Sequence, residues 1–235
     1  MKNLYGDQPW SLSFSAFEVL GWTVGVASVP GSVENPWLSE GERDKARRYV
    51  REGDARRYIA SRLLLREVLG DWLGVDPGSV RFGKAPGGKP FAVSPAGCPP
   101  VFFSLSRSGD FCAVALSGDG EVGLDIEKIE NPFDWEPASR AWLSQGENRA
   151  LRAFKTGLER VEAFFRLWCA REAAAKALGE GLRLAPGSGE SLDGLLEGHG
   201  VTVRLGNRAV RVEEVGAPRG YRLAVAVLPR EEGIA

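Results

Sequence analysis

The stretch WLSQGE at Trp142–Glu147 repeats WLSEGE at Trp37–Glu42 with a single change. A helix-forming segment follows each copy, RYIASRLLLREVLG at Arg57–Gly70 and RLWCAREAAAKALG at Arg166–Gly179. These segments share arginine at their first and sixth positions and end in Leu-Gly. Repetition on this scale indicates that one structural unit occurs twice in the chain.

Strand-like segments flank both helical regions in the same order. The pairs are TVGVASV from Thr23 with EVGLDIE from Glu121, SVRFG from Ser79 with TVRLG from Thr202, and FCAVALS from Phe111 with RLAVAVL from Arg222. Each half therefore has a strand, then helices, then further strands, which is typical of an α+β fold. We predict two similar subdomains related by a pseudo-twofold axis, each a helix packed on a small, mainly antiparallel sheet.

The boundary between the halves is predicted at Gly118-Asp119-Gly120, because glycine and aspartate suit a tight turn. The expected subdomains are therefore residues 1–118 and 119–235. A cleft between two such halves is the first place to expect a ligand.

The composition bounds the class of protein. The chain has 235 residues, of which 43% are hydrophobic and 26% charged, so it can bury a compact core. A net charge of -1 without a long run of one sign gives no reason to expect nucleic acid or membrane as a partner. Three cysteines without C-x-x-C spacing, together with the lack of a long apolar segment, favour a reduced, cytoplasmic, soluble protein. One histidine, His199, excludes a multi-histidine metal site.

The segment VGLDIEKI at Val122–Ile129 alternates apolar and other residues, as a strand with one buried face does. Asp125 and Glu127 then lie on the same face, where mutual repulsion makes it costly to ionise both. An acidic outer face on an edge strand is ordinary, so this pair alone does not define a site.

Comparison of the two halves shows that acids are concentrated in the second. Asp125, Glu127 and Glu172 stand opposite Ala27, Val29 and Leu63 of the first half. Since the first half lacks these acids, maintaining the fold does not require them. They indicate a specialised site in the second half.

Glu172 and Lys176 are four residues apart in an alanine-rich helix that Gly179 can end, so they share a helix face. By itself such a pair is an ordinary surface ion pair. Together with Asp125 and Glu127, however, Glu172 makes an oxygen-rich set suited to Mg²⁺, which binds such ligands together with water and phosphate.

Phosphate binding also requires positive charge. The first half carries a basic run at Arg43–Arg57, a glycine-rich loop FGKAPGGKPF at Phe82–Phe91, and a strand entering a polar turn, VFFSLSRSGDF at Val101–Phe111. A solvated helix face and a hairpin turn explain most of the first two segments. Some of these cations, and the hydroxyls and guanidinium of the third segment, are also suited to bind an anion.

These segments resemble successive motifs of the Sfp-type 4'-phosphopantetheinyl transferases, in the holo-acyl-carrier-protein synthase superfamily. The similar segments are GLDIE at Gly123–Glu127, WCAREAAAKALGEGL at Trp168–Leu182, GGKPF at Gly87–Phe91 and FSLSRSGDF at Phe103–Phe111. The combination of G-x-D-x-E with W-x-x-[KR]-E-x-x-x-K is specific. The resemblance implies a monomer of two α+β halves with coenzyme A in the cleft between them.

The resemblance also assigns roles to residues in matching positions. In the second half, Asp125, Glu127 and Glu172 would hold Mg²⁺, Lys176 would contact phosphate and assist the leaving group, and Glu172 or Glu127 would be the base. In the first half, Lys45, Arg57, Lys89, Ser106 and Arg107 would bind the phosphates and nucleotide of coenzyme A. Arg107 stands where the family usually has histidine, and it keeps the positive charge with a longer side chain.

The implied reaction moves the 4'-phosphopantetheine arm of coenzyme A to a serine of an apo acyl, peptidyl or aryl carrier protein and releases adenosine 3',5'-bisphosphate. Two alternatives stay open: a non-catalytic relative that binds coenzyme A or a carrier protein, and another Mg²⁺-dependent enzyme acting on a nucleotide pyrophosphate. By the same resemblance, residues 128–165 would lie near the carrier protein. Otherwise the aromatic side chains of Phe133, Trp135 and Trp142 belong to the core.

Overall fold

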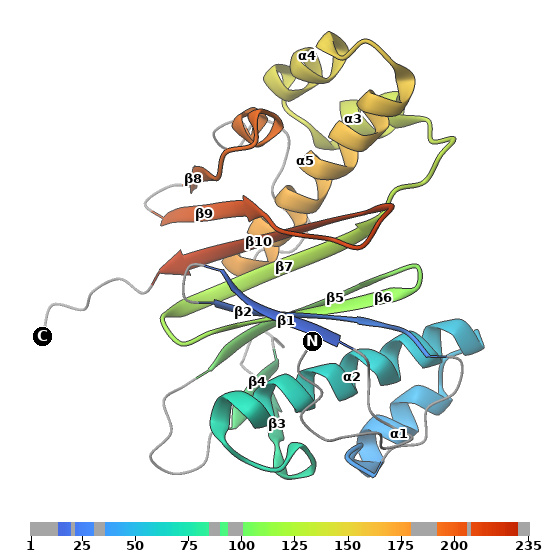
Figure 1. The fold of residues 1–235 in the computed structure, drawn as a ribbon, viewed down its shortest axis with the longest axis vertical. Helices are drawn as coiled ribbons and strands as arrows, with labels where there is room; N and C mark the ends of the chain where they lie inside the picture. The colour runs from blue at the N-terminus through green and yellow to red at the C-terminus, as the bar shows by residue number, and fades with distance from the viewer. Residues whose placement is uncertain are drawn as a thin grey trace, which may run out of the picture. The chain divides into compact units, whose positions relative to one another are not determined.

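The fold is known from a computed structural model. It describes residues 14–19, 22–30, 36–84, 90–93, 101–179, 192–205 and 208–229. The chain forms two compact units, Met1–Gly118 and Asp119–Ala235, each with a four-stranded antiparallel sheet and a long helix (Figure 1). The predicted α+β class is therefore confirmed, while the pseudo-twofold relation stays a prediction.

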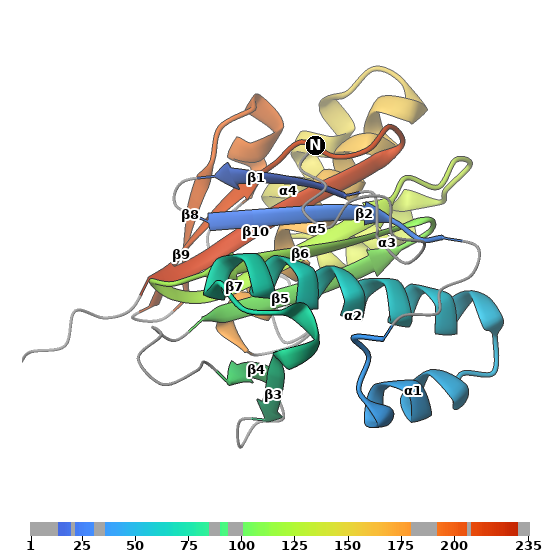
Figure 2. The same cartoon turned by 60° about the horizontal axis from the view of Figure 1, so that its bottom comes forward.

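In the first unit the sheet has the order β1-β2-β6-β5. Its strands are β1 (Phe14–Val19), β2 (Trp22–Ser28), β5 (Phe102–Ser108) and β6 (Phe111–Ser117). The other elements are α1 (Glu40–Arg47), α2 (Glu52–Leu73), the short helix η1 (Pro77–Ser79) and a hairpin of β3 (Arg81–Lys84) with β4 (Pro90–Val93). Helix α2 runs along the sheet (Figure 2) and buries Leu64 and Leu69 in a core shared with Val114 and Leu116 of β6.

In the second unit the order is β7-β10-β9-β8. The strands are β7 (Gly120–Lys128), β8 (Val201–Leu205), β9 (Arg208–Glu214) and β10 (Tyr221–Pro229). The helices are α3 (Trp135–Trp142), α4 (Gln145–Ala153), α5 (Gly157–Leu178) and the short η3 (Asp193–Glu197). As predicted, α5 ends at Gly179, whose φ of 71° is a left-handed conformation that favours glycine. Among the described residues, no helix is long and apolar enough to span a membrane.

The repeated WLS-x-G-E stretch starts a helix in each unit. Ser39 precedes α1 and Ser144 precedes α4, and the hydroxyl of each accepts a hydrogen bond from the backbone N–H three residues later. The carboxylates of Glu42 and Glu147 accept from the backbone N–H of these serines at 2.8 and 2.7 Å. Each stretch is thus a capping box, which explains why serine and glutamate recur at this spacing.

The same glutamates also form ion pairs with the long helix of each unit, which link α1 to α2 and α4 to α5. Arg62 of α2 binds Glu42 at 2.6 Å, and Arg171 of α5 binds Glu147 at 2.6 Å. Arg62 and Arg171 occupy matching positions of the repeat, the sixth residue of each helical segment. Both glutamates are buried, so each unit depends on its arginine to neutralise the carboxylate.

Two glycines let the long helices approach their sheets. A Cβ at Gly123 of β7 would lie 1.9 Å from the carbonyl oxygen of Ala173, which α5 places there. At Gly25 of β2 the nearest atom would be a side-chain carbon of Val68, at 3.0 Å. Because the second unit has alanines on this face of α5, backbone meets backbone, and α5 holds its polar residues close to β7.

Candidate active site

Strand β7 and helix α5 bring Asp125 and Lys176 into contact. The ammonium of Lys176 donates to Oδ1 of Asp125 at 2.6 Å and to the carbonyl oxygen of Leu124 at 3.0 Å. Asp125 is only 3% exposed, so the ammonium of Lys176 meets its carboxylate in a place largely closed to water. The two residues are far apart in the sequence, and the close packing of α5 on Gly123 is what allows the side chain to reach.

Glu172 lies one helical turn before Lys176 and is half-buried. Burial raises the pKa of Glu172, the negative charge of Asp125 raises it further, and Lys176 partly opposes both effects. Three of the predicted catalytic and metal-binding residues therefore interact electrostatically: Asp125, Glu172 and Lys176.

Glu127 lies two residues after Asp125, on the same face of β7 and opposite Arg222 of β10. Its charge and that of Asp125 both act on Cys169, whose Sγ donates to the carbonyl oxygen of Asp125 at 2.8 Å. Burial raises the pKa of the Cys169 thiol well above its usual value, and the two carboxylates add to this. Cys169 is therefore a neutral thiol packed beside the acids.

The donor set suits Mg²⁺ in its chemistry, since Asp125, Glu127 and Glu172 offer carboxylate oxygens only. Within the described parts of the chain, however, no group of three or more acidic, histidine or cysteine side chains is arranged to hold a metal ion. Instead, Lys176 provides the positive charge beside Asp125. A metal-binding role for the three acids is therefore a proposal.

The basic run of the first unit is divided between the end of α1 and the start of α2. Lys45 of α1 places its Nζ 5.1 Å from the ring centroid of Tyr58 on α2. Arg107 of β5 places its guanidinium carbon 5.8 Å from the same centroid. Two of the predicted coenzyme A residues thus meet at one tyrosine, which the motifs did not single out.

The structure describes two of the three remaining predicted coenzyme A residues of the first unit, Arg57 and Ser106. Arg57 pairs with Asp54 and donates to the carbonyl oxygen of Gly109 at 3.4 Å. Ser106 and Arg107 were predicted in a turn, but they lie within β5, paired with β6, and the turn falls at Gly109–Asp110. The strand is longer than predicted because its backbone continues to pair with β6 through Ser108. Lys89 lies outside the described residues.

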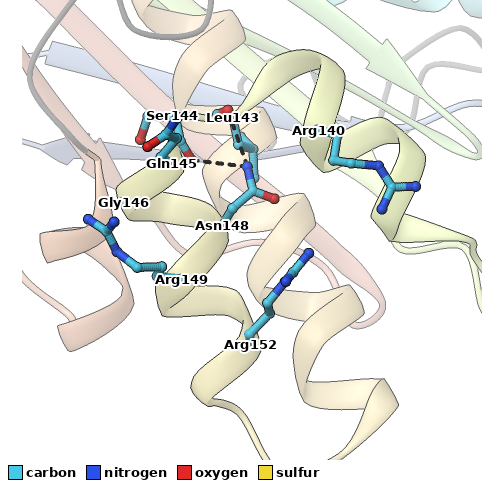
Figure 3. Close-up of a pocket in the computed structure, with 8 residues that line it drawn as sticks. All are labelled: Arg140, Leu143, Ser144, Gln145, Gly146, Asn148, Arg149 and Arg152. Carbon is cyan, nitrogen blue, oxygen red and sulfur yellow. Dashed lines mark hydrogen bonds between the residues drawn. The ribbon is translucent and has the colours of Figure 1, made fainter.

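A pocket of about 780 Å³ lies at the corner between α3 and α4 (Figure 3). It is lined by Arg140, Leu143, Ser144, Gln145, Gly146, Asn148, Arg149 and Arg152. The side-chain amide of Asn148 fixes the corner by donating to the carbonyl oxygens of Ser139, Leu143 and Ser144 at 3.0 to 3.2 Å. None of the predicted site residues lines this pocket. The sequence signal that could have indicated it is the presence of three arginines, Arg140, Arg149 and Arg152, in the two short helices.

The aromatic side chains of this region belong mainly to the core of the second unit. The ring of Phe133 lies 5.0 Å from that of Phe165, and the ring of Trp142 lies 5.5 Å from that of Trp168. Trp135 also packs against the buried cluster. Phe133 and Trp135 thus pack against the core, as one of the two interpretations expected, while Trp142 is half-buried against Trp168. A carrier-protein contact in this region stays a prediction.

Comparison with known proteins identifies the family of the chain. Residues 121–226 match the 4'-phosphopantetheinyl transferase superfamily, and residues 33–118 match the family described as 4'-phosphopantetheinyl transferase, N-terminal. The chain therefore belongs to the 4'-phosphopantetheinyl transferase superfamily. Because both halves match, it is an enzyme of the Sfp type, as the motifs implied.

Three relatives illustrate the similarity. The 4'-phosphopantetheinyl transferase of Bacillus subtilis is 32% identical over 80% of this chain and 81% of its own length. The 4'-phosphopantetheinyl transferase HetI of Nostoc sp. is 29% identical over 77% of both chains. The human L-aminoadipate-semialdehyde dehydrogenase-phosphopantetheinyl transferase is 27% identical over 60% of this chain and 48% of its own length.

Proposed function

We propose that this enzyme transfers the 4'-phosphopantetheine arm of coenzyme A to a serine of an apo acyl, peptidyl or aryl carrier protein, with Mg²⁺, and releases adenosine 3',5'-bisphosphate. The family acts on carrier proteins with coenzyme A as the donor. The observation that carries the proposal is the contact of Lys176 with Asp125, beside Glu172, in the unit that matches the superfamily.

Asp125, Glu127 and Glu172 are the proposed ligands of Mg²⁺. All three are absent from the matching positions of the first half, which supports a role specific to the second. When bound, the ion would supply positive charge to the pyrophosphate of coenzyme A.

Lys176 is proposed to contact phosphate. Its position is fixed at two points, by the carboxylate of Asp125 and the carbonyl oxygen of Leu124. Transfer forms a bond between the serine oxygen and phosphorus and breaks the phosphorus–oxygen bond to the departing nucleotide, which leaves with the electron pair. Fixed positive charge is what such a transfer requires, because its catalysis rests on positioning and on neutralising charge.

Glu172 or Glu127 is the proposed base that removes the proton of the serine hydroxyl. The raised pKa of Glu172 favours it, because a base is more effective when its pKa is closer to neutral pH. In the first unit, Lys45, Arg57, Lys89, Ser106 and Arg107 are the proposed residues for the phosphates and nucleotide of coenzyme A. The shared contact of Lys45 and Arg107 with Tyr58 supports a common role for these two cations.

The carrier protein is proposed to bind at the face that α3 and α4 form around the pocket. The support is its charge, because Arg140, Arg149 and Arg152 line it. Of these three, only Arg140 pairs with an acid among the residues that the structure describes, with Glu136 at 3.2 Å. Guanidinium groups pair well with the carboxylates of an acidic protein surface.

The function is tested by incubating the enzyme with coenzyme A, Mg²⁺ and a panel of apo carrier proteins, and measuring the intact mass of each carrier. We expect the phosphopantetheine increment on at least one carrier and its loss with Glu127→Ala. If a folded, metal-supplemented enzyme modifies no carrier, the proposal is wrong. In that case calorimetry with coenzyme A distinguishes the two alternatives, since binding without turnover identifies a non-catalytic relative.

A further inference from the structure

We infer that the ring of Tyr58 positions Lys45 and Arg107 for the phosphates of coenzyme A, and that Tyr58 is therefore a positioning residue of the co-substrate site. The inference rests on the proposed function, because it takes these two cations to bind coenzyme A. It adds a residue to which the family motifs quoted above give no role, and a reason for the arginine at position 107.

Tyr58 is placed where three elements of the first unit meet. It lies near the start of α2 and is only 7% exposed, whereas Lys45 of α1 and Arg107 of β5 are exposed. The two cations lie 5.1 and 5.8 Å from the centroid of the ring. Both distances fall within the roughly 6 Å over which a cation is attracted to an aromatic face.

The ring itself is held in place and uncharged. Tyr49 packs against it with 5.6 Å between the ring centroids. Burial raises the pKa of the Tyr58 phenol, Arg62 lowers it by a smaller amount, and Glu42 raises it further. The phenol is therefore neutral near neutral pH, and the ring offers a fixed, electron-rich face to both cations.

The charges around Tyr58 leave the two cations available to an anion. Two nearby arginines form ion pairs with acids one helical turn away, Arg47 with Asp44 and Arg57 with Asp54. In the described part of the chain, by contrast, neither Lys45 nor Arg107 pairs with a carboxylate. An aromatic face attracts a cation without cancelling its charge, so both can still attract phosphate.

The arginine at position 107 suits this arrangement. Its long side chain spans from β5 to the Tyr58 ring, with the guanidinium carbon 5.8 Å from the ring centroid. An arginine guanidinium is planar, so it can stack on an aromatic ring and still offer N–H donors to phosphate. Arg57, the residue before Tyr58, binds the carbonyl oxygen of Gly109 in the turn that follows β5. The start of α2 therefore contacts the β5–β6 hairpin twice, through Arg57 at the turn and through Tyr58 at Arg107. Ordering these side chains in advance lowers the entropic cost of binding.

The test is calorimetric titration of the intact enzyme with coenzyme A and Mg²⁺. Tyr58→Met keeps a large apolar side chain but removes the ring, and we expect it to raise the Kd about 5- to 20-fold. Tyr58→Phe keeps the ring, and we expect a Kd within about twofold of the unmodified enzyme. In turnover, Tyr58→Met should raise the KM for coenzyme A much more than it lowers kcat.

Phe82 provides a matched control. Its ring lies 4.0 Å from the guanidinium carbon of Arg62 in the same unit, and it packs against the core. Phe82→Leu should therefore lower the Tm and leave the Kd for coenzyme A unchanged. This comparison separates a general loss of stability from a specific loss of positioning.

A double-mutant cycle that combines an exposed cation with Tyr58 provides a second test. Arg107→Gln should weaken binding, and its effect should be smaller in the Tyr58→Met background if the ring and the guanidinium act as a pair. Independent effects would overturn the inference, as would normal binding by Tyr58→Met. Equal weakening by Tyr58→Phe and Tyr58→Met would also overturn it, by assigning the effect to the hydroxyl. If the unmodified enzyme does not bind coenzyme A, the proposed function fails as well.

Discussion

Glu67 and Lys176 occupy matching positions of the repeat but carry opposite charges. Lys176 binds Asp125, whereas the residue that matches Asp125 in the first half is Ala27. Glu67 is fully buried, and neither of its carboxyl oxygens has a hydrogen-bond partner among the described residues. Burial accordingly raises the pKa of Glu67 to about 7. Near neutral pH the first unit thus contains a buried carboxyl group that is partly protonated.

Because of Glu67, we expect the stability of the folded chain to fall as pH rises. The pKa of Glu67 is higher in the folded chain than in the unfolded chain, so the folded state binds the proton more tightly. The contribution of Glu67 to the free energy of unfolding is complete below about pH 4.5 and is lost as pH rises to about 7. The loss amounts to about 3 kcal/mol at most. Urea unfolding at pH 5 and at pH 8 measures the free energy of unfolding at each pH. Between these two pH values the free energy of unfolding should decrease less for Glu67→Gln than for the unmodified chain. Equal decreases would contradict the prediction.

At the scale of elements, the contact between β7 and α5 sets the position of Lys176. Gly123→Ala would place a methyl group 1.9 Å from the carbonyl oxygen of Ala173, so the helix would have to move away from the strand. We expect a loss of about 3 kcal/mol or more in the free energy of unfolding, together with loss of turnover.

Two other glycines serve as controls for this prediction. Gly41 in α1 has open space around a Cβ, and alanine is the better helix former, so Gly41→Ala should be neutral or slightly stabilising. Gly25→Ala meets only side-chain atoms, the closest at 3.0 Å, and should cost less than Gly123→Ala. Denaturant titration of the three variants ranks them. A Gly123→Ala protein as stable as the Gly41→Ala protein would show that the close approach does not constrain α5.

The face formed by α3 and α4 carries the next prediction. Reversing two charges, with Arg149→Glu and Arg152→Glu together, should raise the KM for an acidic carrier protein about 10-fold and leave the KM for coenzyme A unchanged. The difference between this variant and the unmodified enzyme should shrink at high salt, since exposed charges are screened. Arg204→Glu and Arg219→Glu together, at two exposed positions outside this face, are the matched control because they change the net charge by the same amount. Equal effects of the control and the double variant would point to net charge rather than to this face.

For the whole molecule, the internal repeat of the sequence predicted more of the fold than any other feature. It predicted the α+β class, and all six repeated strand segments form strands. The two capping boxes and the buried Glu42–Arg62 and Glu147–Arg171 pairs were not predicted. These pairs join residues 20 to 24 positions apart, so local periodicity does not reveal them.

The candidate site was predictable in its residues but not in its contacts. Spacing placed Glu172 and Lys176 on one helix face, which suggested that they pair with each other. The structure instead directs Lys176 to Asp125 and Leu124, because Gly123 brings the helix backbone close to β7. Tyr58 was missed for a similar reason: its two cations come from α1 and β5, and only the folded chain brings them together.

Each unit has its own buried core and its own ion pair between glutamate and arginine, so each should respond separately to loss of that pair. Glu42→Gln leaves Arg62 and Arg66 without their carboxylate, and Glu147→Gln does the same to Arg171. Removing one partner of a buried pair costs about 3 to 5 kcal/mol. In hydrogen exchange followed by mass spectrometry, Glu42→Gln should accelerate exchange in α2 and Glu147→Gln in α5. If either variant accelerated both helices equally, the chain would open as one cooperative unit, and a change in one half would alter activity through the stability of the whole.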